Sequence, residues 1–114
     1  MTQVEKHKVA EYPQGISEEE FNEIVQKGGK VLVDVFTSWC GPCKRVKPIF
    51  QELAMEKEDI IFVSLDLDYS RWIGEKYDIH AIPTFLFFKD GVMIYKHLGG
   101  MFKDGFESMI KEKF

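Results

Sequence analysis

The chain has 114 residues, of which 45% are hydrophobic and 14% aromatic, and its 15 basic and 19 acidic residues give a formal net charge of −4 at neutral pH. This balance excludes a protein that uses a basic surplus to bind nucleic acid or an anionic membrane surface. No apolar run approaches the roughly 20 residues of a membrane-spanning helix. We therefore expect residues 1–114 to form a single domain with its own core, which binds neither nucleic acid nor membrane.

The first residues, MTQVEKHKVAEYP, lack the apolar stretch of a signal peptide, and the acids Glu5 and Glu11 are unlike a transit peptide. We therefore expect a cytoplasmic location. Because the cytosol is reducing, a purely structural disulfide between the only two cysteines, Cys40 and Cys43, is not expected there. The loop between them is also too short for a disulfide to restrict the unfolded chain much.

The first predicted elements are a short strand near Lys8–Tyr12 and a helix that follows Ser17. Ser17 and Glu20 have the spacing of a capping box, in which the serine hydroxyl satisfies a backbone N–H of the first turn. Gly28-Gly29 ends this helix. Its buried face is formed by Phe21, Ile24 and Val25, with Ile16 packing onto Phe21 from outside the helix.

Strands and helices alternate through the middle of the chain. Lys30–Phe36 is apolar at nearly every position, which indicates a central strand covered on both faces. A strand at Ile60–Leu67 and a short helix around Ser70–Tyr77 come later. Between these strands, apolar residues recur at helical spacing after the cysteines: Val46, Ile49, Phe50, Leu53 and Ala54.

The last third of the chain predicts a hairpin and a helix. Thr84–Lys89 and Val92–Leu98 flank Asp90-Gly91, a dipeptide favoured in two-residue hairpin turns. The final helix covers Lys103–Lys113, with Phe106, Met109 and Ile110 turned inward. Strand–helix alternation implies parallel crossovers, whereas the tight turn makes the last two strands antiparallel. The predicted fold class is α/β, with a mixed sheet and helices on both faces.

Cys40 and Cys43 lie between the central strand and the helix that follows it, and this placement points to a redox pair. Disulfide exchange needs a thiolate to attack and a second thiol to resolve the mixed disulfide. Cys40 would lie at the helix N-terminus, where free backbone N–H groups favour negative charge, so we assign it as the nucleophile. Cys43, one turn further in, would be more buried and act as the resolving thiol. Pro42 fits the first turn, where its missing N–H costs nothing.

Trp39-Cys40-Gly41-Pro42-Cys43 resembles the active-site signature of the thioredoxin family. The resemblance extends over essentially the whole chain and implies a thioredoxin fold, a central mixed sheet of about five strands flanked by about four helices. Further matching positions are Asp34 six residues before Cys40, Pro48 inside the following helix, Ile82-Pro83-Thr84, Phe88-Lys89-Asp90-Gly91 and Gly99.

The resemblance adds two catalytic-site expectations. Asp34 stands alone in an apolar run, so its charged form is costly and its pKa should be raised. The family pattern places this carboxyl beneath Cys43, where it can exchange a proton as the mixed disulfide resolves. The Ile82–Pro83 bond should be cis, although most X–Pro bonds are trans. The Ile82 backbone would then form a docking edge for an extended substrate segment.

The family resemblance also implies a substrate-binding rim formed by Trp39, Gly41, Pro42, Ile82, Pro83 and Gly99, with Gly100 beside it. Two positions depart from the family pattern. Ser64 stands where the family often has a lysine close to the buried acid, which should favour neutral Asp34. Gly74 replaces a more usual alanine and should weaken the short helix. Asp66 and Asp68 are interpreted as the end of a strand that leaves the core, and no function is assigned to these two acids.

A protein-disulfide reductase that acts as an electron carrier is the implied function. The resemblance implies no bound cofactor, electrons from NADPH through a thioredoxin reductase, oxidised protein substrates and a monomer. Three alternatives remain. A zinc site is disfavoured, because the sequence has no second Cys pair or close His pair to complete four ligands, and His7, His80 and His97 are scattered. An oxidising isomerase lacks a secretory signal, and a redox-independent partner or scaffold subunit is disfavoured by the intact motif.

Overall fold

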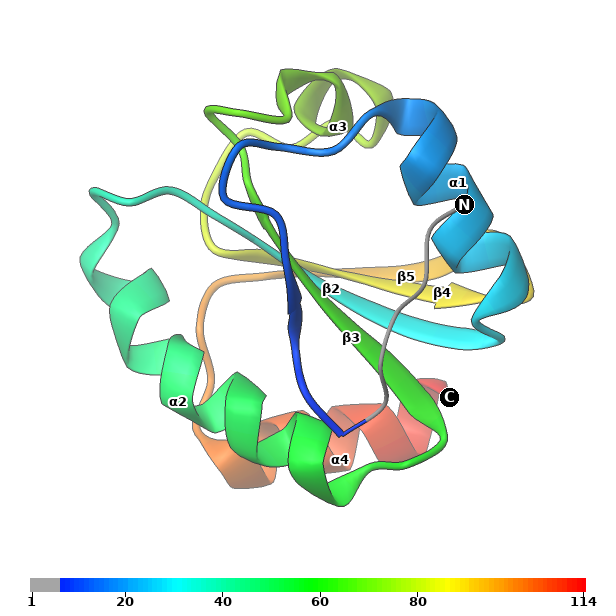
Figure 1. The fold of residues 1–114 in the computed structure, drawn as a ribbon. Helices are drawn as coiled ribbons and strands as arrows, with labels where there is room; N and C mark the ends of the chain where they lie inside the picture. The colour runs from blue at the N-terminus through cyan, green and yellow to red at the C-terminus, as the bar shows by residue number, and fades with distance from the viewer. Residues whose placement is uncertain (1–6) are drawn as a thin grey trace.

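The computed structural model describes residues 7–114, which contain one five-stranded mixed sheet and four helices (Figure 1). This agrees with the fold class expected from the sequence. The elements in chain order are β1 (Ala10–Glu11), α1 (Glu18–Lys27), β2 (Lys30–Phe36), α2 (Gly41–Glu56), β3 (Ile60–Asp66), α3 (Arg71–Lys76), β4 (Thr84–Lys89), β5 (Val92–Leu98) and α4 (Lys103–Lys113).

The strands have the order β1-β3-β2-β4-β5, with β2 in the middle of the sheet. β3 is parallel to both β1 and β2, whereas β4 is antiparallel to β2 and β5 is antiparallel to β4. The parallel pair β2–β3 is joined by the crossover helix α2, and the antiparallel pair β4–β5 by the turn at Asp90-Gly91. Both turn residues have positive φ, 51° and 86°, as this class of two-residue turn requires. The predicted topology is confirmed.

Helices cover both faces of the sheet, with α1 and α3 on one side and α2 and α4 on the other (Figure 1). The core is accordingly divided into two clusters. Val31, Val33 and Val35 of β2 belong to the cluster that includes α1 and α3, whereas Leu32 belongs to the cluster that includes α2 and α4. Because side chains alternate along a strand, Asp34 is directed to the same face as Leu32, beneath α2.

The capping of α1 agrees with the sequence. Ser17 is the N-cap residue, and its hydroxyl accepts a hydrogen bond from the Glu20 amide at 3.1 Å. The helix ends at Gly28, and Gly29 has a φ of 70°. Ile16 and Phe21 are both buried in the same core cluster.

The first strand is shorter than predicted. It comprises Ala10 and Glu11 alone instead of Lys8–Tyr12, because only these two residues have partners in β3. β1 lies at the edge of the sheet, so a single neighbour decides its length. Among residues 7–114, no helix has the length and apolar character needed to cross a membrane.

Candidate active site

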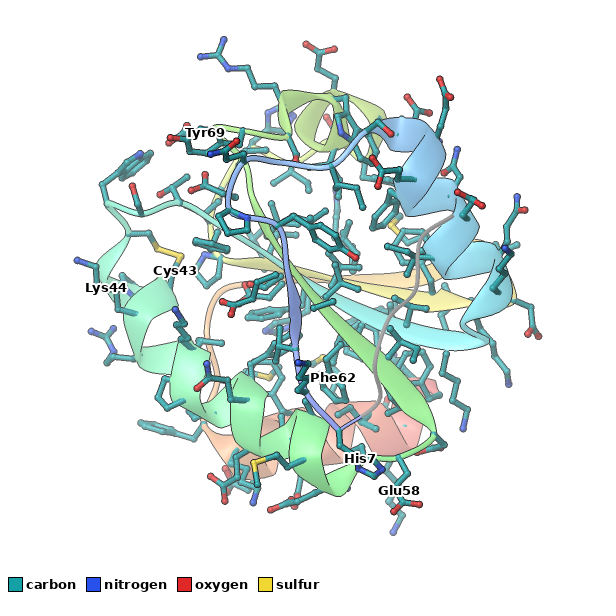
Figure 2. The ribbon with its side chains drawn as sticks, in the orientation of Figure 1. His7, Cys43, Lys44, Glu58, Phe62 and Tyr69 are labelled. Carbon is teal, nitrogen blue, oxygen red and sulfur yellow. A yellow bond between two sulfur atoms is a disulfide. The ribbon has the colours of Figure 1, made fainter. Side chains whose placement is uncertain are left out.

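Cys40 and Cys43 form a disulfide at the start of α2 (Figure 2). Cys40 is the N-cap residue, and its Sγ accepts a hydrogen bond from the Cys43 amide at 3.2 Å. Pro42 lies in the first turn, as expected. Cys43 is more buried than Cys40, as expected, but only slightly, with 4% and 6% of their surfaces exposed. The disulfide keeps both sulfur atoms at the same end of the helix.

The first turn of α2 contains no acidic residue, and Lys44, Arg45 and Lys47 follow the disulfide directly. Figure 2 shows Cys43 and Lys44 together at this end of the helix. Free backbone N–H groups and nearby cations both favour negative charge on a sulfur atom at this position. The surroundings of the pair therefore suit a thiolate.

Asp34 is 3% exposed within the central strand, and burial raises its pKa to about 7. Its Oδ1 and the Thr37 hydroxyl have no hydrogen-bond partner among residues 7–114. A buried carboxyl without a partner is more stable protonated than charged. The raised pKa agrees with the expectation from the apolar run, and it brings the proton exchange of Asp34 close to neutral pH.

A cavity of about 250 Å³ connects Asp34 to Cys43. Ser64 lies opposite Asp34 in the β2–β3 pairing and also borders this cavity. On the exposed side, Lys47 and Glu11 form an ion pair at 3.7 Å, so the lysine charge is shared with a carboxylate other than Asp34. The full lining is Glu11, Asp34, Phe36, Thr37, Ser38, Cys43, Lys44, Lys47 and Ser64. The Asp34 carboxyl and Cys43 therefore border the same cavity.

The segment before β4 contains a cis peptide bond between Ile82 and Pro83, as the resemblance implied. Pro83 is buried and Ile82 is half-buried. The Gly99 amide donates to the Pro83 carbonyl at 2.8 Å, which joins the two loops expected to form the rim. Gly99 has a φ of 93°, a conformation that favours glycine.

Trp39 is 70% exposed, so it is not a core residue. Its Nε1 donates a hydrogen bond to Asp68 Oδ2 at 3.1 Å, and the Asp68 amide donates to Asp66 Oδ1 at 2.9 Å. We had assigned no function to these two acids, and the structure shows that they orient the tryptophan beside the disulfide. No local pattern signals this contact, because the partners are 29 residues apart.

Gly74 has a packing role that the sequence did not indicate. A Cβ atom at this position would lie 3.0 Å from Leu67 Cδ1, closer than ordinary van der Waals contact.

The histidines are dispersed: His80 is exposed beside Asp78, and burial against Phe85 lowers the pKa of His97. Within residues 7–114, no three His, Cys, Asp or Glu side chains gather into a group that could hold a metal ion.

The disulfide lies where the chain passes from a strand into a helix, and a buried carboxyl borders the adjoining cavity. This arrangement is typical of the class of thiol–disulfide oxidoreductases. The sequence model of the thioredoxin family matches residues 12–112. The chain belongs to the thioredoxin family, whose members are protein-disulfide oxidoreductases, and the Cys40–Cys43 pair fits a redox-active site.

Individual relatives agree with this membership. The chain is 40% identical to a thioredoxin of Mycoplasmoides gallisepticum over 92 residues, 81% of this chain and 92% of that protein. It is 35% identical to a thioredoxin of Chlamydia trachomatis over 99 residues, 87% of this chain and 96% of that protein. The short form of thioredoxin f from spinach chloroplast superimposes with a TM-score of 0.84 at 30% identity, over 99% of this chain and 98% of that one.

Proposed function

We propose that this protein reduces disulfide bonds of protein substrates, with Cys40 as the attacking and Cys43 as the resolving thiol. The observation that carries the proposal is the Cys40–Cys43 disulfide at the N-terminus of α2. The Cys43 amide donates to Cys40 Sγ, and such a donor would stabilise a Cys40 thiolate in the reduced protein. Cys40 caps the helix and Cys43 lies within its first turn, which supports this order of roles.

The exchange proceeds in two balanced steps. The Cys40 thiolate attacks one sulfur of the substrate disulfide, forms a mixed disulfide and releases the other substrate sulfur as a thiolate. The Cys43 thiolate then attacks Cys40 Sγ, forms the intramolecular disulfide and releases the second substrate sulfur. Two electrons pass from the dithiol to the substrate. Asp34 acts as the general base and accepts the Cys43 proton through their shared cavity. A pKa of Asp34 near 7 suits this role.

The substrate segment lies along a rim of Trp39, Gly41, Pro42, Ile82, Pro83 and Gly99. The exposure of Trp39 and the hydrogen bond between Gly99 and Pro83 support this rim. Electrons reach the oxidised protein from NADPH through a thioredoxin reductase, so no resident cofactor is needed. The protein acts as a cytoplasmic monomer of one domain over residues 1–114.

Reduction of insulin disulfides tests the function directly. The purified protein is incubated with insulin, NADPH and a thioredoxin reductase, and NADPH oxidation is followed together with the precipitation of the insulin chains. We expect turnover that depends on both the protein and the reductase. A folded protein that gives no turnover, even with dithiothreitol as the reductant, would contradict the proposal and favour the redox-independent partner.

A further inference from the structure

A second surface feature adjoins the redox pair, on the side away from Asp34. The chain between β5 and α4 runs alongside α2 (Figure 1), and together they enclose a groove of about 310 Å³. We call it the α2–α4 groove. It is lined by Pro42, Arg45, Val46, Ile49, Gly100, Met101 and Phe102.

The groove lining is mostly apolar, and one lining residue, Phe102, has no structural role that explains its exposure. Val46 is buried, whereas Ile49 and Met101 are half-buried. Phe102 is 82% exposed, more than any other large hydrophobic residue among residues 7–114. It occupies the N-cap position of α4 without making a side-chain cap, where Ser, Thr, Asp or Asn would stabilise the helix. Phe102 therefore serves neither the core nor the helix, which indicates a role in binding.

The groove is continuous with the redox site. Pro42 lies between the two cysteines in the sequence, and Gly100 follows Gly99, whose amide bonds to Pro83. A protein whose disulfide reaches Cys40 must therefore cover the near end of the groove. From Pro42 to Ile49 the groove follows α2 for seven residues, roughly 10 Å at the helical rise. This length corresponds to about three residues of an extended chain.

The charges around the groove favour a substrate that carries an acidic residue next to an apolar side chain. Arg45 borders the groove and has no ion-pair partner within the described part of the chain. The acids Glu52 and Glu56, further along α2, are both bound by Lys103 at 2.7 and 2.6 Å. Lys103 compensates one of these two negative charges, and Arg45, the charged residue of the groove lining, can attract a carboxylate.

We propose that the α2–α4 groove binds a large apolar side chain of the substrate, about three residues from the reacting cysteine, with an adjacent carboxylate held by Arg45. The inference rests on the proposed disulfide reduction and adds a sequence preference to it. Phe102 and Ile49 enclose the apolar side chain, and Arg45 selects the acidic neighbour.

The test compares four synthetic peptides that carry the same intramolecular disulfide. At the third residue from the reacting cysteine they contain Leu or Ser, and at the next position Glu or Gln. The second-order rate of reduction by the reduced protein is measured by stopped flow. We expect Leu to be favoured over Ser by roughly tenfold, the selectivity of an apolar pocket. Phe102→Ser and Ile49→Ser should remove this preference, and Arg45→Gln should remove the smaller preference for Glu.

Met55→Ser is the matched control, since Met55 is an exposed apolar residue near the other end of α2, 67% exposed. It should keep both preferences. A second measurement traps the Leu peptide on Cys43→Ser and records NMR contacts between the leucine methyls and the Phe102 ring. Equal rates for all four peptides, or preferences unchanged in Phe102→Ser, would overturn this inference alone. If no peptide is reduced, the proposed function fails and the inference fails with it.

Discussion

Asp34 of β2 lies directly opposite Ser64 of β3, and both border the cavity that reaches Cys43. A serine cannot compensate the charge of a buried carboxylate, and the nearby Lys47 is paired with Glu11. Desolvation therefore acts unopposed and raises the pKa of Asp34 to about 7. The same lack of a charge partner makes the charged form of Asp34 a cost to the stability of the fold.

The first prediction concerns the pH dependence of stability. The pKa of Asp34 is about 7 in the folded protein and 3.8 in the unfolded chain. Between these values the unfolded chain releases this proton while the folded protein keeps it, so stability should fall as pH rises. The loss should begin near pH 4, reach roughly 4 kcal/mol and level off above pH 7. Urea unfolding at a series of pH values measures it.

Asp34→Asn separates this contribution from all other titrations. At pH 8 the variant should be more stable than the wild type by roughly 4 kcal/mol, the full loss that Asp34 causes, because an amide replaces a buried charge. At pH 3.5, where Asp34 is mostly protonated in both states, the two proteins should be about equally stable. Disulfide reduction should be slower in the variant, since the amide cannot accept the Cys43 proton. Equal stability at both pH values would mean that Asp34 is solvated or paired.

Ser64→Lys should supply the missing charge partner. A lysine beside Asp34 favours the carboxylate, so the pKa of Asp34 should fall by about 1–3 units. Ser64→Met is the matched control, because its side chain extends into the same space without a charge. Carboxyl ¹³C titration by NMR distinguishes the two. An equal pKa of Asp34 in both variants would show that the lysine points away from the cavity.

The two cysteines should differ when replaced one at a time. Cys40→Ser should abolish disulfide reduction, because the one thiol left in the sequence, that of Cys43, is not assigned as the attacking one. Cys43→Ser should accumulate a mixed disulfide through Cys40, because the resolving thiol is gone. Mass spectrometry after mixing each variant with an oxidised substrate gives the answer. Normal turnover by Cys43→Ser would show that the assigned roles are wrong.

Gly74 offers a test of packing against helix propensity. In an open helix, Gly→Ala stabilises by about 1 kcal/mol. Here the new Cβ would lie 3.0 Å from Leu67 Cδ1, so Gly74→Ala should gain less than this in the wild type. In a Leu67→Ala background the obstruction is absent, and the full gain should appear. Thermal unfolding of the four proteins in this cycle measures the difference. An equal gain in stability in both backgrounds would show that Leu67 does not restrict residue 74.

Most elements could be predicted because their signals are local. The apolar run of β2, the Asp90-Gly91 turn and the periodicity of α4 each lie within one short segment, and the bounds of β2, β4, β5 and α4 agree with the prediction. Cys40 and Cys43 are two residues apart, so their joint placement at a helix start also follows from sequence spacing. The raised pKa of Asp34 follows from its isolation in an apolar strand.

Other features depend on residues that meet only after folding. The length of β1 is set by its two partners in β3, the orientation of Trp39 by Asp68, and the space at Gly74 by Leu67. The α2–α4 groove likewise joins Pro42 and Arg45 to Phe102, more than fifty residues later in the chain. Local periodicity carries no information about such pairs, because the crossovers and the sheet register decide which distant side chains come into contact.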